Sequence, residues 1–197
     1  MTDTPRRQRG FSLVELMVVI VVAAILVAIA LPSFRDVIRR NQVSGASNTL
    51  LASLDYARTE AITRGQLVSI CPSTDGASCT SSGKAFDPGW IIYTYPAGAA
   101  SANKAYSASG SILMRAITAR SGVSIQAKST EVISYGQQGQ LVSSVSTTPT
   151  LTFATCFRSG STGTGQSTTS VPGVEMDVNG SGSVTSKPWT VGAACTP

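Results

Sequence analysis

The feature that most constrains this chain is a long apolar run near its N-terminus. It extends from Phe11 to Leu31 and contains one charged residue, Glu15. A helix of that length spans about 30 Å, which is enough to cross a lipid bilayer. Arg6, Arg7 and Arg9 precede the run, so we expect the short N-terminus to stay in the cytoplasm and the rest of the chain to lie outside.

Two ordinary interpretations of this run leave something unexplained. A secretory signal peptide is shorter and ends in an A-x-A-like cleavage site, which is absent here. A simple membrane anchor explains the length but not Gly10-Phe11 at its edge or Glu15, because a carboxylate in the bilayer core costs roughly 2.5–3.5 kcal/mol. A local reason for Glu15 exists, since Ser12 and Glu15 fit a capping box and negative charge suits the first turn of a helix.

Beyond Pro32, which ends the apolar run, apolar residues recur at steps of three and four. This spacing is typical of one face of a helix, and Gly65 is a suitable C-cap. The sequence therefore predicts one helix from about Ser12 to Arg64, with a membrane-embedded first half and an amphipathic second half. The apolar positions are Phe34, Val37, Ile38, Val43, Ala46, Leu50, Leu54, Ala57 and Ala61.

After Gly65 the pattern changes to short segments rich in Val, Ile, Tyr and Thr, separated by Gly, Ser and Pro. Asn179-Gly180 predicts a hairpin, and the Gly/Ser/Thr-rich stretch 159–173 predicts a flexible loop. The fold class is α+β, with a long N-terminal helix packed on antiparallel sheet. The predicted strands are Leu67–Cys71, Trp90–Tyr95, Ser111–Thr118, Val123–Ala127, Glu131–Tyr135, Leu141–Val145, Leu151–Arg158, Val174–Val178 and Ser183–Ser186.

The composition argues against catalysis, because the chain has no histidine. That excludes a Ser-His-Asp triad, a Cys-His dyad and other mechanisms that need imidazole. Glu175 and Asp177 are the only close carboxylate pair in the strand-rich part, and no partner motif accompanies them. We therefore expect no enzyme activity and no cofactor.

Four cysteines, Cys71, Cys79, Cys156 and Cys195, lie in the part expected outside the membrane, where disulfides form. Three connectivities are possible. We favour Cys71–Cys79 with Cys156–Cys195, because each bridge then fastens an otherwise loose segment. Without histidine this spacing is poor for zinc, so we expect no metal site.

The stretch from Arg9 to Met17, RGFSLVELM, resembles the class III signal of type IV prepilins and type II secretion pseudopilins. The resemblance implies that a prepilin peptidase cuts after Gly10 and methylates the amino group of Phe11. It also implies that Glu15 pairs with the N-terminal amine of a neighbouring subunit during assembly. The chain would then be a single-pass protein of the bacterial inner membrane with a periplasmic C-terminal part.

Further segments resemble the GspH/FimT group of minor pilins and pseudopilins: Leu54–Ile62, Val68–Ser73, Cys79 and Gly89–Tyr93. The resemblance implies a low-abundance, tip-proximal subunit that helps to prime a filament and contacts other pilin-like subunits. It leaves open a type IV pilus or a type II secretion pseudopilus, with a slight preference for the pilus. The expected parts are a leader (1–10), a membrane segment (11–31), an amphipathic helix (32–65) and a β-rich domain (66–197).

DNA uptake is the alternative function, because some members of this group are DNA receptors with a Gly-Arg-x-Arg motif near the C-terminus. The corresponding hairpin here, Val178–Val184, has no arginine. From Gly65 onward, seven basic residues stand against five acidic ones, a net +2, and DNA binding needs several cations acting together. The candidate DNA contacts are Arg115, Arg120 and Lys128 around one predicted hairpin, and Arg158 beside the loop.

Overall fold

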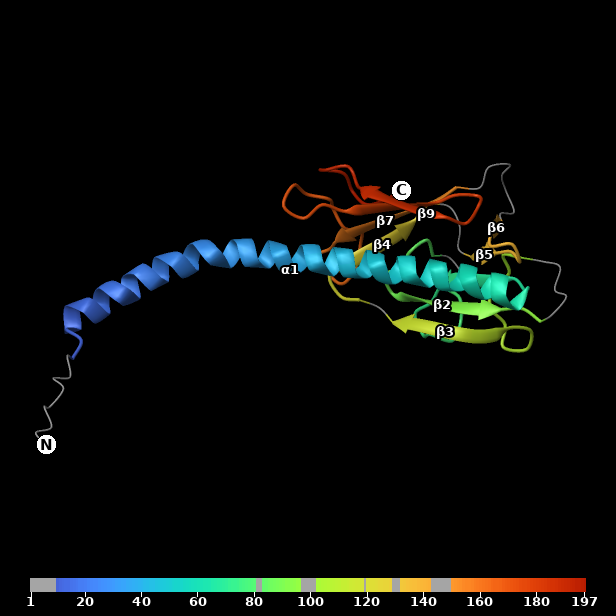
Figure 1. Cartoon of the computed structure of the whole chain (residues 1–197), viewed down its shortest axis with the longest axis horizontal. Coiled ribbons are helices and arrows are strands. Elements are labelled where there is room, and N and C mark those ends of the chain that lie inside the picture. Colours follow the sequence, from blue (N-terminus) through green and yellow to red (C-terminus); the bar gives the residue numbers. More distant parts are fainter. Residues whose placement is uncertain (1–9, 81–82, 97–101, 119, 129–131, 143–149) are drawn as a thin grey trace, which may run out of the picture. The chain divides into compact units, whose positions relative to one another are not determined.

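The computed structural model describes residues 10–80, 83–96, 102–118, 120–128, 132–142 and 150–197. It divides into two compact units, residues 1–38 and residues 39–197. One helix belongs to both units, and all strands lie in the second. The second unit is the one drawn with the arrows in Figure 1.

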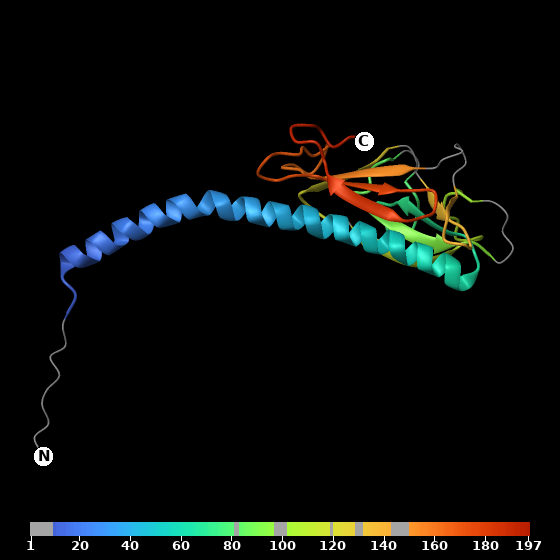
Figure 2. The ribbon, with the colours of Figure 1, turned by 45° about the horizontal axis from the view of Figure 1, so that its top comes forward.

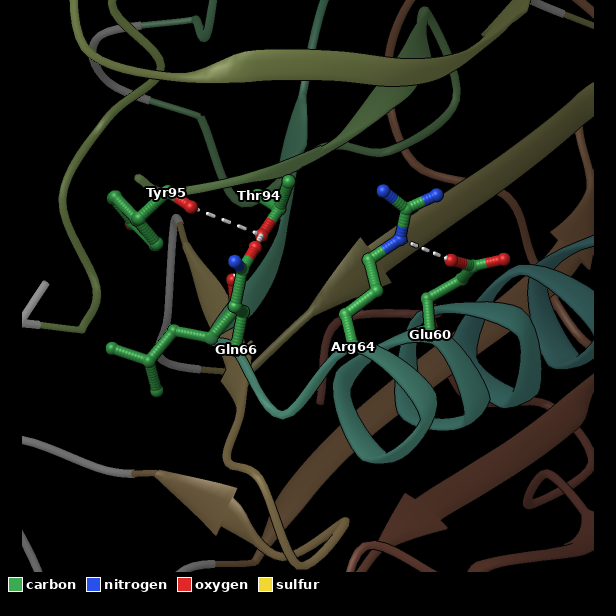
Figure 3. Close-up of polar contacts among 6 residues, drawn as sticks. Glu60, Arg64, Gln66, Thr94 and Tyr95 are labelled. Carbon is green, nitrogen blue, oxygen red and sulfur yellow. Dashed lines mark hydrogen bonds and ion pairs between the residues drawn. The ribbon is translucent and has the colours of Figure 1, made fainter. Parts of the chain in front are cut away.

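The helix α1 extends from Leu13 to Arg64, as the sequence predicts, and it continues through position 32. It ends at Gly65, which adopts a positive φ of 60°. The N–H of Gln66 then donates to the carbonyl of Ala61 at 3.3 Å, which satisfies one of the last carbonyls of the helix. Arg64 forms an ion pair with Glu60, one turn earlier, at 2.5 Å (Figure 3).

The first strand is joined to this helix end. The hydroxyl of Thr94 donates to the side-chain oxygen of Gln66 at 3.4 Å and to the carbonyl of Leu67 at 2.8 Å. Figure 3 shows Gln66 and Thr94 side by side at this corner. The C-terminal end of the helix is therefore joined to the sheet by hydrogen bonds between Thr94 and the connecting residues Gln66 and Leu67.

The strands lie close to their predicted positions, and the described part of the chain arranges them in two antiparallel sheets. The first sheet has the order β3-β2-β1-β5-β6 and the second has the order β4-β7-β8-β9. Their bounds are β1 Val68–Pro72, β2 Gly89–Thr94, β3 Ile112–Thr118, β4 Val123–Ala127, β5 Ile133–Tyr135, β6 Leu141–Val142, β7 Leu151–Phe157, β8 Val174–Val178 and β9 Val184–Pro188.

The core of the second unit lies between the second half of α1 and the inner faces of both sheets. Leu50 and Leu54 of the helix are fully buried and belong to one apolar cluster with Ile92 of the first sheet and Phe153 and Met176 of the second. Figures 1 and 2 both show this part of α1 running along the strands. The α+β class with a long helix packed on antiparallel sheet is confirmed.

The segment 159–173 is a loop, as its composition predicts, and part of it is tied to other parts of the chain. Ser167 is buried, and its N–H donates to the carbonyl of Ala193 in the C-terminal tail at 3.2 Å. Gln166 and Ala194 form an isolated β-bridge. Arg40 of α1 also donates from Nε to the carbonyl of Ser170. These contacts join the loop to the C-terminal tail and to the helix.

Candidate assembly site and basic surface

The residues assigned to processing and assembly lie together at the start of α1. Gly10, Phe11 and Glu15 are exposed, Phe11 to 77%. Ser12 is the N-cap: its hydroxyl accepts from the N–H of Glu15 at 3.2 Å, and its carbonyl accepts from the N–H of Leu16 at 3.2 Å. The carboxylate of Glu15 lies in the first turn, where the helix dipole favours negative charge.

The helix segment that follows exposes apolar side chains on all sides. Every large apolar residue from Leu13 to Ile29 is about half exposed or more within the first unit. By length and composition α1 can cross a membrane. The leader residues 1–9, with Arg6, Arg7 and Arg9, lie outside the described part of the chain.

Arg158, a candidate DNA contact, is engaged inside the protein. Its Nη1 forms an ion pair with Asp87 at 2.6 Å, and both side chains are only 9% exposed. The same atom donates to the carbonyl of Gly163 at 3.0 Å, and Gln126 donates to the other oxygen of Asp87 at 2.9 Å. Arg158 is therefore not available to a phosphate. Sequence reasoning missed Asp87, and a partner 71 positions away leaves no local signal.

The other three candidate cations do not share a hairpin. Arg115 lies on β3, Arg120 lies in the connection between β3 and β4, and Lys128 directly follows β4. The strands β3 and β4 belong to different sheets. The guanidinium of Arg115 lies 5.3 Å from the ring centroid of Tyr56 on α1, a cation–π contact. The positive charge of Lys128 instead helps to lower the pKa of Asp177 in the second sheet. The expected clustering around one hairpin is wrong, because the chain crosses from one sheet to the other between these strands.

The β8–β9 hairpin forms as Asn179-Gly180 predicts, with Val178 paired to Val184. Arg58 of α1, which sequence reasoning missed, holds its turn: it donates to the carbonyl of Ser181 at 3.1 Å and to that of Gly139 at 3.0 Å. Gly182 has a positive φ of 79°, and a Cβ there would collide with the Gly139 carbonyl. The turn is therefore fastened to the helix and to the first sheet.

Glu175 and Asp177 share one cation. Both form ion pairs with Lys187 of β9 at 3.1 Å. Burial raises the pKa of Asp177, but hydrogen bonds from Thr152 and Lys187 and the charges of Lys187 and Lys128 outweigh it, so the pKa lies below its ordinary value. The pKa of Lys187 is raised by its hydrogen bonds to the two carboxylates. The ion pairs between the neighbouring strands β8 and β9 give both carboxylates a structural role.

Two disulfides complete the domain. They join Cys71 to Cys79 and Cys156 to Cys195, with Cα–Cα distances of 5.6 and 6.1 Å. This is the connectivity favoured from the sequence. The second bridge ties the C-terminal tail to β7 and packs with Ala154 and Trp189 in a small apolar cluster. Within the described residues, no cluster of three or more His, Cys, Asp or Glu side chains could hold a metal ion.

Comparison with known proteins places these features in a family context. Residues 5–31 match the family described as Prokaryotic N-terminal methylation motif. Among curated proteins, the chain is 54% identical over 41 residues to fimbrial protein EcpC of Eikenella corrodens, covering 21% of this chain and 27% of that protein. It is 41% identical over 61 residues to a fimbrial protein of Pseudomonas aeruginosa, covering 31% and 39%. The chain thus spans only about a quarter to two fifths of these relatives.

Solved structures of the type IV minor pilin FimU from Pseudomonas aeruginosa are also similar. One is 24% identical, with a TM-score of 0.48 over 74% of this chain and 92% of that chain. The decisive match is with the family described as Type II transport protein GspH, which covers residues 46–184. Because this match spans well over half of the 197 residues, the chain belongs to the GspH family.

Proposed function

We propose that this protein is a minor pilin or pseudopilin that is held in the bacterial inner membrane and then drawn into a filament. A prepilin peptidase cuts after Gly10 and methylates Phe11. The β-domain faces the periplasm and, in the filament, lies close to the tip. The observation that carries the proposal is the exposed apolar segment of α1 directly behind Gly10 and Phe11, together with the match to the N-terminal methylation motif.

The physical argument is that apolar surface on all sides of a helix needs an apolar surrounding. A lipid bilayer supplies one before assembly, and packed helices of other subunits supply one afterwards. Glu15 is the single charge in this segment. In an apolar surrounding its carboxylate needs a cation, and the methylated amine of a neighbouring subunit meets that need.

Processing is tested with Gly10→Val in the full chain. We expect the variant to keep its leader and to stay in the membrane, because a β-branched side chain replaces the glycine at the cut. Gly110→Val is the matched control, since a Cβ there meets no atom within 4 Å. Mass spectrometry of the purified chain shows whether the leader has been removed. A Gly10→Val chain that is cut and assembled like the control would contradict the proposal.

Assembly is tested with Glu15→Ala, with Glu60→Ala as the control for losing a helical carboxylate. We expect Glu15→Ala to be cut but depleted from sheared filaments by about tenfold or more, which corresponds to about 1.4 kcal/mol. Glu60 forms an exposed ion pair within its own helix, so its loss should leave assembly unchanged. Equal incorporation of both variants would remove the assembly role from Glu15.

We assign the filament to a type IV pilus rather than to a secretion pseudopilus. The second disulfide and the Gly/Ser/Thr-rich segment 159–173 support this choice. Deletion of the protein should reduce surface pili and leave type II secretion intact. Loss of secretion with normal pili would assign it to the pseudopilus instead.

DNA uptake is not part of the proposal. Arg158 is paired with Asp87, and Arg115 and Lys128 belong to different sheets. We expect the folded chain to show no steeply salt-dependent DNA binding between 50 and 200 mM salt, as few phosphates could be neutralised together. Binding that falls steeply with salt and weakens in Lys128→Ala would restore the DNA function.

A further inference from the structure

In the part of the chain that the structure describes, the two sheets have four edge strands, and an open edge is a binding surface unless something protects it. The edges are β3 and β6 in the first sheet and β4 and β9 in the second. An edge strand presents a row of unpaired N–H and C=O groups to which another strand can add. Proteins that do not use an edge shorten it, cover it, twist it with a β-bulge, or place charged residues or Pro on it.

Three of these edges carry such protection. The β9 strand ends in Lys187 and Pro188. The β4 strand is covered by residues 84–86, because Phe86 donates its N–H to Ile125 at 2.8 Å and Ala127 donates to Lys84 at 2.7 Å. The β6 strand is two residues long, and the N–H of its Leu141 donates to Gly180 at 3.0 Å.

The β3 strand is the least protected edge within the described residues, because no strand pairs with its outer side and no short segment covers it. Its one charge is Arg115, and its pairing with β2 shifts register between Ile92 and Tyr93. It is seven residues long, ILMRAIT, and contains neither Lys nor Pro. Its Ile112 is 60% exposed, and Leu113 is also exposed. In Figure 1 it is the outermost strand on its side of the first sheet, with no labelled strand beyond it. A largely apolar edge of this length is a place where another strand can add.

The hydrogen-bonding groups that β3 offers can be assigned from the pairing of its neighbours. In β2, the carbonyl of Gly89 accepts from Ser73, and the N–H of Tyr95 donates to Leu67. Because successive residues of an antiparallel strand turn to opposite edges, the odd-numbered residues of β2 face β1 and the even-numbered residues face β3.

The register then fixes the orientation of β3. Trp90 and Ile92 of β2 pair with Ile117 and Arg115, which therefore turn their backbone groups toward β2. Ala116, between them, turns its N–H and C=O outward. A proline at 116 would accordingly remove an outward donor without removing a bond to β2.

An open groove beside this edge has room for the side chains of an added strand. It has a volume of about 560 Å³ and lies between α1 and β3. The helix side is formed by the small residues Asn48, Thr49, Ala52 and Ser53, and the strand side by residues 115–118. An extended segment paired with β3 can therefore place alternate side chains against the helix.

We propose that the outer edge of β3 binds an extended segment of a different filament subunit, which adds to the first sheet as a further strand. The segment carries a carboxylate that faces Arg115, the single charge of β3. A second copy of this chain fits less well, because antiparallel β3–β3 pairing centred on the outward residue Ala116 makes the two Arg115 side chains diagonal neighbours on one face. The proposal rests on the proposed function, since the partner is a subunit of the same filament.

The test uses the full chain in its own cells, with a photoreactive residue at Ile112. Val191, an apolar residue of the tail that is 55% exposed, is the matched control position. We expect Ile112 to cross-link one other filament subunit, within one extended segment located by mass spectrometry. The control position should give no such product.

Two pairs of variants then examine the backbone and the charge. Ala116→Pro should lower the cross-link by about tenfold, and Ala116→Ser, which keeps the N–H, should not. Arg115→Glu should lower it and Arg115→Lys should preserve it, and a Lys in place of the partner's carboxylate should restore it for Arg115→Glu. Intact disulfides in each variant verify that it has folded. If Ala116→Pro does not fold, the comparison of Arg115→Glu with Arg115→Lys tests the proposal instead.

The outcomes separate this proposal from the proposed function. If the unmodified chain is absent from sheared filaments, the proposed function fails and the edge proposal fails with it. If the chain is in filaments but Ile112 links no subunit, or links only a second copy of this chain, only the edge proposal is overturned. A cross-link that is indifferent to both Ala116→Pro and Arg115→Glu also overturns it.

Discussion

The first and second halves of α1 differ in how their apolar side chains are arranged and where they are buried. From Leu13 to Ile29 the apolar residues lie on every side of the helix and are exposed within the first unit. From Val43 to Ala61 they lie at steps of three and four and are almost completely buried. Hydrophobicity alone therefore does not predict burial within the chain. A one-sided stripe packs on the protein's own sheets, and an all-round apolar surface needs partners from outside.

The buried stripe also alternates in size. Leu50 and Leu54 fill the core, and Ala46, Ala57 and Ala61 are equally buried. Small side chains allow the helix backbone to approach the strands closely, while leucines interdigitate with Ile92 and Phe153. The apolar residues from Leu13 to Ile29 form no such one-sided stripe, so their pattern does not select one contact face.

The largest expected effect separates the two halves directly. Leu54→Ala should lower the free energy of unfolding of the β-domain by about 2–5 kcal/mol, because it opens a cavity in a fully buried position. Leu26→Ala in the first half should change it by less than about 0.5 kcal/mol. Urea unfolding of the full chain in detergent, followed by the fluorescence of buried Trp90, measures both. A similar loss in the two variants would contradict the comparison.

A smaller effect concerns the polar side of the second half. Arg58→Met removes hydrogen bonds to the carbonyls of Gly139 and Ser181, and we expect a loss of about 1.5 kcal/mol. Arg64→Met, which removes only an exposed ion pair with Glu60, should cost about 0.3–0.5 kcal/mol. The same unfolding experiment gives both values. Equal losses would mean that Arg58 does not hold the two turns.

The helix start gives a local effect that should not reach the domain. Ser12→Ala removes the N-cap bond to Glu15 and should destabilise the first turn by about 1 kcal/mol, whereas Ser12→Asn should retain the cap. Hydrogen exchange of the Glu15 and Leu16 amides in detergent measures this fraying. A change in the unfolding of the β-domain would show that the two halves are coupled more strongly than their burial indicates.

The smallest effect is a dependence on pH confined to the second unit. The pKa of Asp177 is lower in the folded chain than in the unfolded chain, so the folded state binds fewer protons in acid. Its contribution to stability is complete above the unfolded pKa, about 3.9, and is lost as the pH falls through the folded pKa. We expect the melting temperature to fall less steeply below pH 4 in Asp177→Asn. Identical profiles would mean that the ion pair with Lys187 adds nothing.

The sequence by itself determined the features that depend on neighbouring residues. Ser12 and Gly65 mark the ends of α1, because capping acts within one turn. The strands Val123–Ala127 and Val174–Val178 were predicted to the residue from their composition and punctuation. The leader motif and the apolar run are also recognisable from the sequence, because each is a continuous stretch of residues.

The tertiary structure alone decided which of these elements meet. It placed β3 and β4, close in sequence, in different sheets, and it paired Arg158 with Asp87. Among the described residues, it also left the outer side of β3 without a neighbouring strand. Local rules reach only a few residues along the chain. Strand order and long-range ion pairs follow instead from packing the whole core, so no single segment of the sequence contains them.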